Sequence, residues 1–282
     1  MKLSLVICTR NRAAQLSDCL ETILHIECED AWELVIVDNG STDNTSIIIE
    51  QFRDSFSGQL TVEIEALPGL SRARNRGWRS ANGDIIAFTD DDCYPDPKFL
   101  QTLIECFEED PNLGFVGGRI LLHDPTDYRI TFQESEQRQE VLPCSFINAG
   151  FIQGSNFAFR KRAIESVNGF DELLGAGTRF ASEDVDILAR MSAKGWFGCY
   201  DPRPLVYHHH RRKTESEAAQ LMKQYDRGRG AYYVKCLTNP LLRNVYLKNL
   251  SWKVRSQNLE TTYREFAAAM EYMAIAIANA CK

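Results

Sequence analysis

Three consecutive carboxylates, Asp90–Asp92, follow a short apolar run at residues 85–88. A continuous apolar run of this kind is typical of a strand that is buried on both faces. Adjacent carboxylates repel one another and raise each other's pKa unless a cation is present. The pattern therefore indicates a divalent metal site, and its hard oxygen ligands favour Mg²⁺ or Mn²⁺ over zinc. A solvated acidic turn is the alternative, but Pro95 and Pro97 already supply the turn.

A buried arginine is expected on a helix over residues 69–81. Its apolar and small side chains define one inward face, and Arg74 lies on that face. An arginine on a buried face is rarely unpaired. Arg74 is therefore either an ion-pair partner for nearby carboxylates or a phosphate ligand, and the pattern alone favours neither.

Two acids begin a helix over residues 182–191, which Ser182 is expected to cap. Asp184 heads the apolar stripe of this helix, so we expect its carboxylate to point inward, whereas Glu183 lies on a more polar face. Acids in a first helical turn also complement the helix dipole without any chemistry, and that alternative stays open.

Three histidines, His208–His210, end a strand predicted over residues 205–210. Alternation along the strand places His208 and His210 on one face and His209 on the other. The cluster suggests a metal or phosphate role, with solvated loop positions as the alternative for His209 and His210.

A further strand is predicted over residues 151–159, and Gly154 interrupts it. Such an interruption indicates either a close approach of the backbone to a ligand or a plain β-bulge.

Strands and helices alternate through the first hundred residues, which predicts a parallel sheet with right-handed crossovers. Ligands bind outside the carboxyl ends of the strands in such sheets, so we expect Asp38 and the acidic triplet at one edge. The predicted strands cover residues 3–8, 32–37, 60–65 and 84–88. Downstream we expect a helix over residues 98–109, a strand over 113–122, and three helices over 215–237, 241–255 and 259–280.

The charge of the chain is unevenly distributed. The net charge is −7 over 282 residues, but residues 1–202 carry 18 basic and 33 acidic side chains, whereas residues 203–282 carry 14 and 6. The basic C-terminal portion is expected to face phosphate or a membrane surface. The alternative is that the two portions attract each other. The alanine-rich segment at residues 266–281 is amphipathic, so it either lies on a membrane or packs onto the body of the protein.

Nine cysteines at irregular spacing include no C-x-x-C pair, which is typical of reduced thiols in a cytosolic protein. The N-terminus lacks the pattern of a signal peptide, and no apolar run reaches the ~20 residues that span a bilayer. We therefore expect a cytoplasmic protein, with peripheral contact to the inner face of the membrane through its basic portion. No nucleic acid partner is expected, and the oligomeric state is left open.

Taken together, these motifs resemble the family 2 glycosyltransferases of the GT-A fold. The resemblance covers roughly residues 3–212 and rests on seven motifs in a fixed order: Val6–Arg12, Val37–Asp43, Gly69–Gly77, Phe88–Asp92, Asn168–Asp171, Glu183–Asp184 and the histidine strand. It implies an α/β, Rossmann-like, mostly parallel central sheet flanked by helices. Residues 1–212 would form the catalytic domain, with a nucleotide-binding half over about 1–120 and an acceptor half over about 121–212, and residues 213–282 a helical extension.

The resemblance also implies roles for individual residues. Asp92 and His208 would hold Mn²⁺ or Mg²⁺, Asp184 would be the general base, and Glu183 would be its neighbour or substitute. Separately from the resemblance, the interrupted strand makes Gly154 and Asn156 our candidates for the acceptor or sugar pocket. Six residues would bind the donor nucleotide, with Arg74 at the pyrophosphate and Asp38 at the base: Thr9, Arg10, Asp38, Arg74, Asp90 and Asp91.

The function implied is a metal-dependent, inverting transfer of a sugar from a nucleotide-diphosphate donor, with a UDP-sugar favoured. The acceptor would be a hydroxyl of a saccharide or a lipid-linked molecule in cell-surface polysaccharide or glycolipid assembly. One alternative is a nucleotidyltransferase that acts on sugar phosphates, but residues 9–12 replace the glycine-rich, lysine-containing loop expected there. Another is a non-catalytic nucleotide-sugar-binding protein, which the presence of both Asp184 and a complete triplet disfavours.

Overall fold

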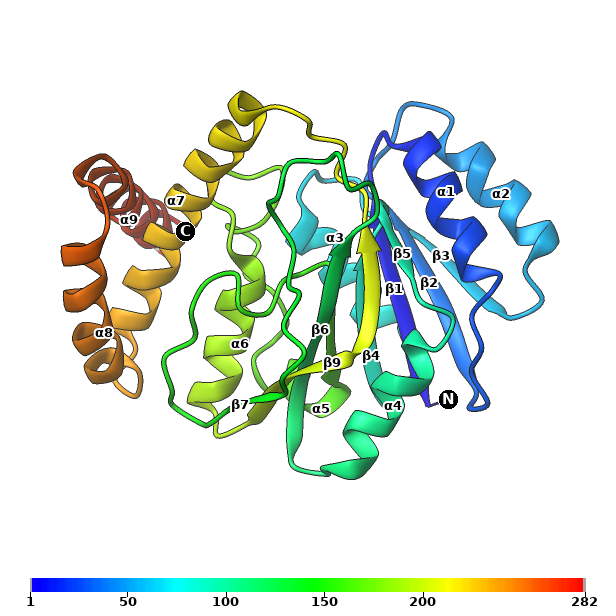
Figure 1. Ribbon diagram of the computed structural model, residues 1–282, viewed down its shortest axis with the longest axis horizontal. Helices are drawn as coiled ribbons and strands as arrows, with labels where there is room; N and C mark the ends of the chain where they lie inside the picture. Colours follow the sequence, from blue (N-terminus) through cyan, green and yellow to red (C-terminus); the bar gives the residue numbers. More distant parts are fainter. Residues whose placement is uncertain (1, 281–282) are drawn as a thin grey trace.

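A single sheet of nine strands runs through the computed structural model, which describes residues 2–280 (Figure 1). The strands are β1 Leu3–Thr9, β2 Trp32–Asp38, β3 Gln59–Ile64, β4 Ile85–Asp90, β5 Cys93–Pro95, β6 Leu113–Leu122, β7 Gln139–Val141, β8 Asn156–Arg160 and β9 Phe197–His208. Their order is β3-β2-β1-β4-β8-β6-β9-β5, and β7 pairs with β9 outside this path. The predicted α/β fold class is confirmed.

The first half of the sheet is parallel, as predicted. β1 pairs with both β2 and β4, and β2 pairs with β3, all in parallel register. Three helices connect these strands: α1 Ala13–Ile23, α2 Thr45–Ser55 and α3 Leu70–Ser80. The carboxyl ends of β1, β2 and β4 therefore lie side by side, and this edge receives the polar residues that follow each strand.

The second half of the sheet is mixed. β8 is antiparallel to both β4 and β6, β9 is parallel to β6, and the short β5 and β7 pair antiparallel with β9. Three helices belong to this half: α4 Phe99–Glu109, α5 Lys161–Ser166 and α6 Glu183–Ala193.

Several elements of the second half differ from the prediction. β5, β7 and α5 were not predicted, because each is six residues or shorter and gives little periodic signal. β9 begins at Phe197, well before residue 205, because Pro202 and Pro204 conceal its first half. The turn expected at Pro95 is instead part of β5, which pairs with β9. The strand expected from residue 151 begins only at Asn156.

Apolar side chains are buried on both faces of the sheet. One face packs against α3, α5 and α6, and the other against α1, α2 and α4. This two-sided burial explains why β1, β2 and β4 read as continuous apolar runs.

Three further helices, α7 Glu215–Thr238, α8 Arg243–Ser256 and α9 Leu259–Ala280, confirm the predicted C-terminal helices. They lie at one end of the molecule, and α1 and α2 lie at the other (Figure 1). Lys235 of α7 forms ion pairs with Asp171 and with Asp186 of α6, and Tyr272 of α9 donates a hydrogen bond to Asp171 at 2.7 Å. These contacts join the helices to the sheet region, while the domain boundary near residue 212 stays a prediction.

Within residues 2–280, none of the helices combines the length and the apolar composition needed to cross a membrane. The last two residues of the chain, including Cys281 of the predicted amphipathic segment, lie outside the described residues.

Helix α3 packs directly on the sheet because Gly77 has no side chain. A Cβ there would lie 2.4 Å from Cγ1 of Val6 and 3.1 Å from Cγ2 of Val37. We expect Gly77→Ala to lower the free energy of unfolding by about 1–3 kcal/mol, because overpacking outweighs the gain in helix propensity of about 1 kcal/mol. Chemical denaturation measures this change. Ser17→Ala, at an exposed position of α1, is the control and should change stability by about 0.5 kcal/mol or less. A Gly77→Ala protein as stable as the unsubstituted chain would contradict the packing account.

Candidate active site

The polar residues at the carboxyl edge of the sheet are brought together by strand register. Thr9 is the register partner of Asp38, and Cys8 is that of Asp90. The Thr9 hydroxyl donates a hydrogen bond to Oδ2 of Asp91 at 2.7 Å, and Oδ1 of Asp38 accepts one from the Ser41 amide at 2.8 Å. The structure thus gathers the predicted donor residues at one edge, with Arg10 exposed beside them.

Asn39, a residue that the sequence analysis missed, fixes the loop that leads into α3. Its Nδ2 donates to the carbonyl oxygens of Glu65 and Leu67 at 2.9 and 2.7 Å, and its Oδ1 accepts from the Gly69 amide at 2.9 Å. Asn39 is buried, so these bonds replace those it would make with water. The start of α3, and hence the position of Arg74, depends on this side chain.

Arg74 is buried at the junction of three elements. Its Nη1 donates to Oε1 of Glu183 at 2.7 Å, and its Nη2 donates to Oδ1 of Asp90 and to the carbonyl oxygen of Gly154, both at 3.0 Å. The guanidinium also lies over the Phe157 ring at 5.1 Å from its centroid. Of the two interpretations left open by the pattern, the structure shows the ion pair.

The implied contact of Arg74 with a pyrophosphate does not fit this geometry. The residue is only 2% exposed, and both of its terminal nitrogens already bond to the protein. A phosphate could reach it only after buried carboxylates had lost their partner, which is unfavourable. Arg74 is therefore a positioning residue in this structure.

Two residues expected in the acceptor or sugar pocket instead support the scaffold. A Cβ on Gly154 would lie 2.8 Å from Nη2 of Arg74, so the close approach at this glycine is to an arginine. Asn156 is fully buried, and its Nδ2 donates to the carbonyl oxygens of Arg119 and Pro204 at 2.8 and 3.0 Å. The Asn156 side chain is thus bonded to the backbones of β6 and β9, and its place in an acceptor or sugar pocket stays a prediction that these contacts do not support.

The two acids at the start of α6 exchange the orientations expected of them. Glu183 is buried against Arg74, whereas Asp184 is partly exposed and its Oδ2 accepts a hydrogen bond from the Gly154 amide at 3.2 Å. The expectation failed because α6 is buried on nearly all sides, so apolar periodicity does not define an inward face. Ser182 makes no side-chain cap; it adopts a left-handed backbone with φ 79°.

Burial raises the pKa of both Glu183 and Asp184 above the ordinary range of carboxylates. The positive charge of Arg74 opposes the rise in the pKa of Glu183, and the negative charge of Asp184 adds to it. Hydrogen bonds from the Val185 and Gly154 amides oppose the rise in the pKa of Asp184. Asp184 is the more accessible of the two, and a carboxylate with a raised pKa is a stronger base at neutral pH.

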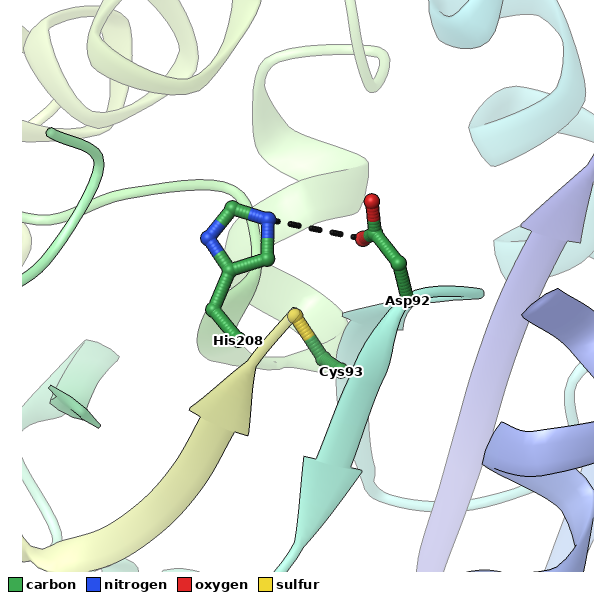
Figure 2. A group of neighbouring side chains, drawn as sticks. All are labelled: Asp92, Cys93 and His208. Atoms are coloured by element: carbon green, nitrogen blue, oxygen red, sulfur yellow. Dashed lines mark ion pairs between the residues drawn. The ribbon is translucent and has the colours of Figure 1, made fainter. Parts of the chain in front are cut away.

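Asp92, in the turn between β4 and β5, lies against His208 at the end of β9, with Cys93 beside them (Figure 2). Nε2 of His208 is 3.5 Å from Oδ1 of Asp92. Nδ1 of His208 lies 3.1 Å from the carbonyl oxygen of Thr131, and a carbonyl only accepts, so Nδ1 carries the proton. The other nitrogen therefore points toward Asp92, the arrangement by which proteins orient metal-binding histidines.

The donor atoms at this position fit a divalent cation. One ligand atom from each of Asp92, Cys93 and His208 lies within 4.8 Å of the others. Burial raises the pKa of the Cys93 thiol well above its ordinary value, so the thiol stays protonated and is a weak ligand. A carboxylate and an imidazole remain, a pair that suits Mn²⁺ better than the all-oxygen preference of Mg²⁺.

A second cluster, Asp124, Asp127 and His209, also has the spacing of a metal site. The ammonium of Lys213 lies in it, bonded to Asp124 and 2.7 Å from Oδ1 of Asp127. A cation of the protein itself thus neutralises these acids. His208 and His210 share a face and His209 packs against Tyr94, which confirms the alternation expected for the histidine strand.

Arg12 is the cation that the sequence analysis overlooked in this site. Its Nη2 donates to Oδ2 of Asp92 at 2.5 Å, and its Nη1 lies 3.3 Å from Oδ1 of Asp91. Burial raises the pKa of Asp91 to about 7, although the charge of Arg12 opposes the shift. Burial also favours a higher pKa for Asp92, but the hydrogen bonds and charges of His208 and Arg12 have the larger effect and lower the pKa of Asp92. The sequence signal that could have identified Arg12 is its position as a basic residue in the loop after the first strand.

Replacing Arg74 tests its positioning role. We expect Arg74→Met to lower the free energy of unfolding by about 3–5 kcal/mol, because it leaves Glu183 and Asp90 without their partner. The matched control is Arg53→Met, which removes an exposed ion pair of α2 with Glu50 and should cost about 1 kcal/mol or less. Denaturant titration of both proteins makes the comparison. Equal, small losses would show that the buried guanidinium does not hold these elements together.

The comparisons with known proteins agree with this architecture. The model of the family described as "Glycosyl transferase family 2" matches residues 4–167. An uncharacterized glycosyltransferase of Nostoc is 30% identical over 177 residues, which is 61% of this chain and 54% of the relative. The glucosyl-dolichyl phosphate glucuronosyltransferase of Haloferax volcanii is 28% identical, over 62% and 58%. Glycosyltransferase AglE of the same organism is 24% identical, over 99% and 92%. The chain thus spans little more than half of the first two relatives.

Solved structures share the fold. The mannosyltransferase PcManGT from Pyrobaculum calidifontis, in complex with GDP-Man and Mn²⁺, superposes with a TM-score of 0.69 at 19% identity, over 98% of this chain and 75% of that one. S. aureus TarS 1-349 in complex with UDP-GlcNAc gives 0.65 at 18% identity, over 96% and 80%. At these identities the likeness shows the fold alone. The family match, which covers more than half of the chain, shows that this protein belongs to glycosyl transferase family 2.

Proposed function

We propose that the protein transfers a sugar from a nucleoside-diphosphate donor, with a UDP-sugar favoured, to a hydroxyl acceptor with inversion of the anomeric centre. The observation that carries the proposal is the contact network of Arg74. It joins Asp90, in the acidic triplet, to Glu183, the neighbour of Asp184. A donor site at the triplet and a base at the start of α6 are thereby held next to each other.

The donor would bind along the carboxyl edge of the sheet. We assign Thr9, Arg10, Asp38, Asp90 and Asp91 to the nucleotide. Neighbours of the same fold were solved with GDP-Man and with UDP-GlcNAc, so nucleotide sugars are donors of suitable chemistry, and the preference for uridine stays a proposal.

Asp92 and His208 would hold the metal, with Mn²⁺ preferred over Mg²⁺. When bound there, a divalent ion supplies positive charge that stabilises the leaving diphosphate. The protein contributes the orientation of both ligands, because the Thr131 carbonyl fixes the His208 ring. Arg12 replaces Arg74 as our candidate phosphate ligand. The Arg12 side chain is 38% exposed and forms ion pairs with Asp91 and Asp92. A metal ion bound to these acids would neutralise their negative charge, which would free the guanidinium to contact the donor.

Asp184 would act as the general base. An acceptor hydroxyl is a poor nucleophile at neutral pH, so a carboxylate within hydrogen-bond reach must take its proton as the new glycosidic bond forms. Two backbone amides hold the Asp184 carboxylate, those of Gly154 and Val185. Glu183 is occupied by Arg74 and is better described as a positioning residue. A single displacement needs no covalent intermediate, and the anomeric centre inverts.

The acceptor is proposed to be a saccharide or a lipid-linked molecule. Relatives of this chain carry the names poly-beta-1,6-N-acetyl-D-glucosamine synthase and glucosyl-dolichyl phosphate glucuronosyltransferase, which cover both classes. A cytoplasmic location is proposed with it. The eight cysteines within the described residues are all free, as expected in a reducing compartment.

The proposal predicts different effects for the two acids of α6. Asp184→Asn should leave binding of the nucleoside diphosphate within about twofold, and it should reduce turnover by about 10²–10⁴, the usual contribution of a general base. Release of nucleoside diphosphate from a panel of UDP-, GDP- and TDP-sugars, with and without saccharide acceptors, measures turnover. The anomeric configuration of the product, read by NMR, tests inversion.

Glu183→Gln is the comparison variant. It keeps the shape of the side chain and a hydrogen bond to Arg74, so it should retain more turnover than Asp184→Asn. Near-normal turnover of Asp184→Asn on a productive donor and acceptor pair would refute the assignment of the base.

A further inference from the structure

Helix α9 presents an apolar stripe to solvent. Its exposed large apolar residues recur at the spacing of one helix face: Leu259, Tyr263, Phe266, Met270 and Ile277. Leu259 is 88% exposed, and the stripe extends about 27 Å along the helix at 1.5 Å per residue. The opposite face of α9 packs against α7 through Ala268 and Tyr272. Helix α9 therefore uses one apolar face within the molecule and leaves a second one uncovered.

Helix α8, next along the chain, combines exposed apolar and basic side chains. Trp252 is 72% exposed, and Leu247 and Val254 are also exposed. The helix has four basic residues and no acidic one: Arg243, Lys248, Lys253 and Arg255. Lys253 bonds to the Tyr233 hydroxyl of α7, whereas Lys248 and Arg255, seven residues apart, are both exposed on one side, which we call the basic face of α8. Both helices lie at the same end of the molecule, away from α1 and α2 (Figure 1).

Two of the three basic residues directly after the histidine strand already bond to acids of the protein. Arg211 bonds to Asp18, and Lys213 is bonded within the cluster of Asp124 and Asp127. The exposed basic residues of α8 are thus better placed to contact an external anionic surface than Arg211 and Lys213 are.

We propose that the α9 stripe and the basic face of α8 dock on the surface of an anionic lipid bilayer. An exposed apolar face with tryptophan, tyrosine and phenylalanine, accompanied by lysine and arginine, has the composition of helices that lie in the membrane interface. The docking is peripheral, because none of the helices within the described residues can span a bilayer. This inference goes beyond the proposed reaction and does not depend on its donor or acceptor.

A second copy of the chain is the other occupant to consider. In a twofold contact the same patch is used by both partners, so the basic face of α8 would lie against or beside its own symmetry mate. Like charges across such an interface oppose association, whereas anionic headgroups complement them. The positive charge of α8 therefore favours an anionic lipid surface over a second copy of the chain as the partner.

Vesicle binding of the full chain tests this proposal. We expect sedimentation with vesicles that contain phosphatidylglycerol, weaker binding to phosphatidylcholine alone, and weaker binding at high salt. Tryptophan emission should shift to shorter wavelength on binding, and Trp252→Phe should abolish most of that shift. A wild-type protein that stays in the supernatant with anionic vesicles overturns the proposal.

Paired variants separate the apolar and the charged contributions. Phe266→Asp/Ile277→Asp should weaken vesicle binding about tenfold or more, while Ile47→Asp/Ile64→Asp, at exposed apolar positions of α2 and β3, should not. Lys248→Glu/Arg255→Glu should reduce binding to anionic vesicles more than Lys98→Glu/Lys194→Glu, at exposed positions elsewhere. Equal losses in variants and controls overturn the proposal. So does a solution dimer that Phe266→Asp/Ile277→Asp converts to a monomer, since the stripe would then belong to a second copy.

Discussion

The site depends on one buried guanidinium. Arg74 receives its position from α3, whose first turn is set by Asn39, and it is held by carboxylates at the end of β4 and the start of α6. Three segments that are distant in sequence thus share one charge centre. Moving one of these charges away would leave the others buried without a partner, which costs several kcal/mol of free energy. The three segments therefore resist separate movement. This resistance would keep the base and the donor edge that we propose in a fixed relation.

The second constraint is electrostatic. Five acids, Asp90, Asp91, Asp92, Glu183 and Asp184, gather at one edge of the sheet, and burial raises the pKa of three of them. Arg74 and Arg12 compensate part of this charge, each from a different side. Arg74 is enclosed and Arg12 is partly open. A divalent ion beside Asp92 would neutralise more of this charge. The diphosphate of a donor is itself an anion, which the ion and Arg12 would bind in the reaction that we propose.

Much of the fold could be predicted because the local signals were strong. The apolar runs of β1, β2 and β4 and the amphipathic segment of α9 stand out in the sequence, and the acids after β2 and β4 lie at the edge where ligands bind in sheets of this kind. Tertiary contacts decided the rest. Nothing local distinguishes Asn156 as a side chain between strands, or Gly154 as the neighbour of an arginine. Glu183 and Asp184 could not be ranked by burial, because Arg74 of α3 covers Glu183 on the face of α6 that periodicity marked as the more polar one.

The central claim is that Asp92 and His208 hold a cation that the nucleotide diphosphate requires. Calorimetric titration of UDP, TDP, GDP and ADP, each with Mn²⁺ and after chelation, tests it most directly. The account predicts Mn²⁺-dependent binding of one diphosphate, which Asp92→Asn and His208→Ala both weaken while the control His25→Ala, at an exposed position of the chain, leaves it unchanged. Binding that is equally tight after chelation, or that survives both substitutions, would contradict the account.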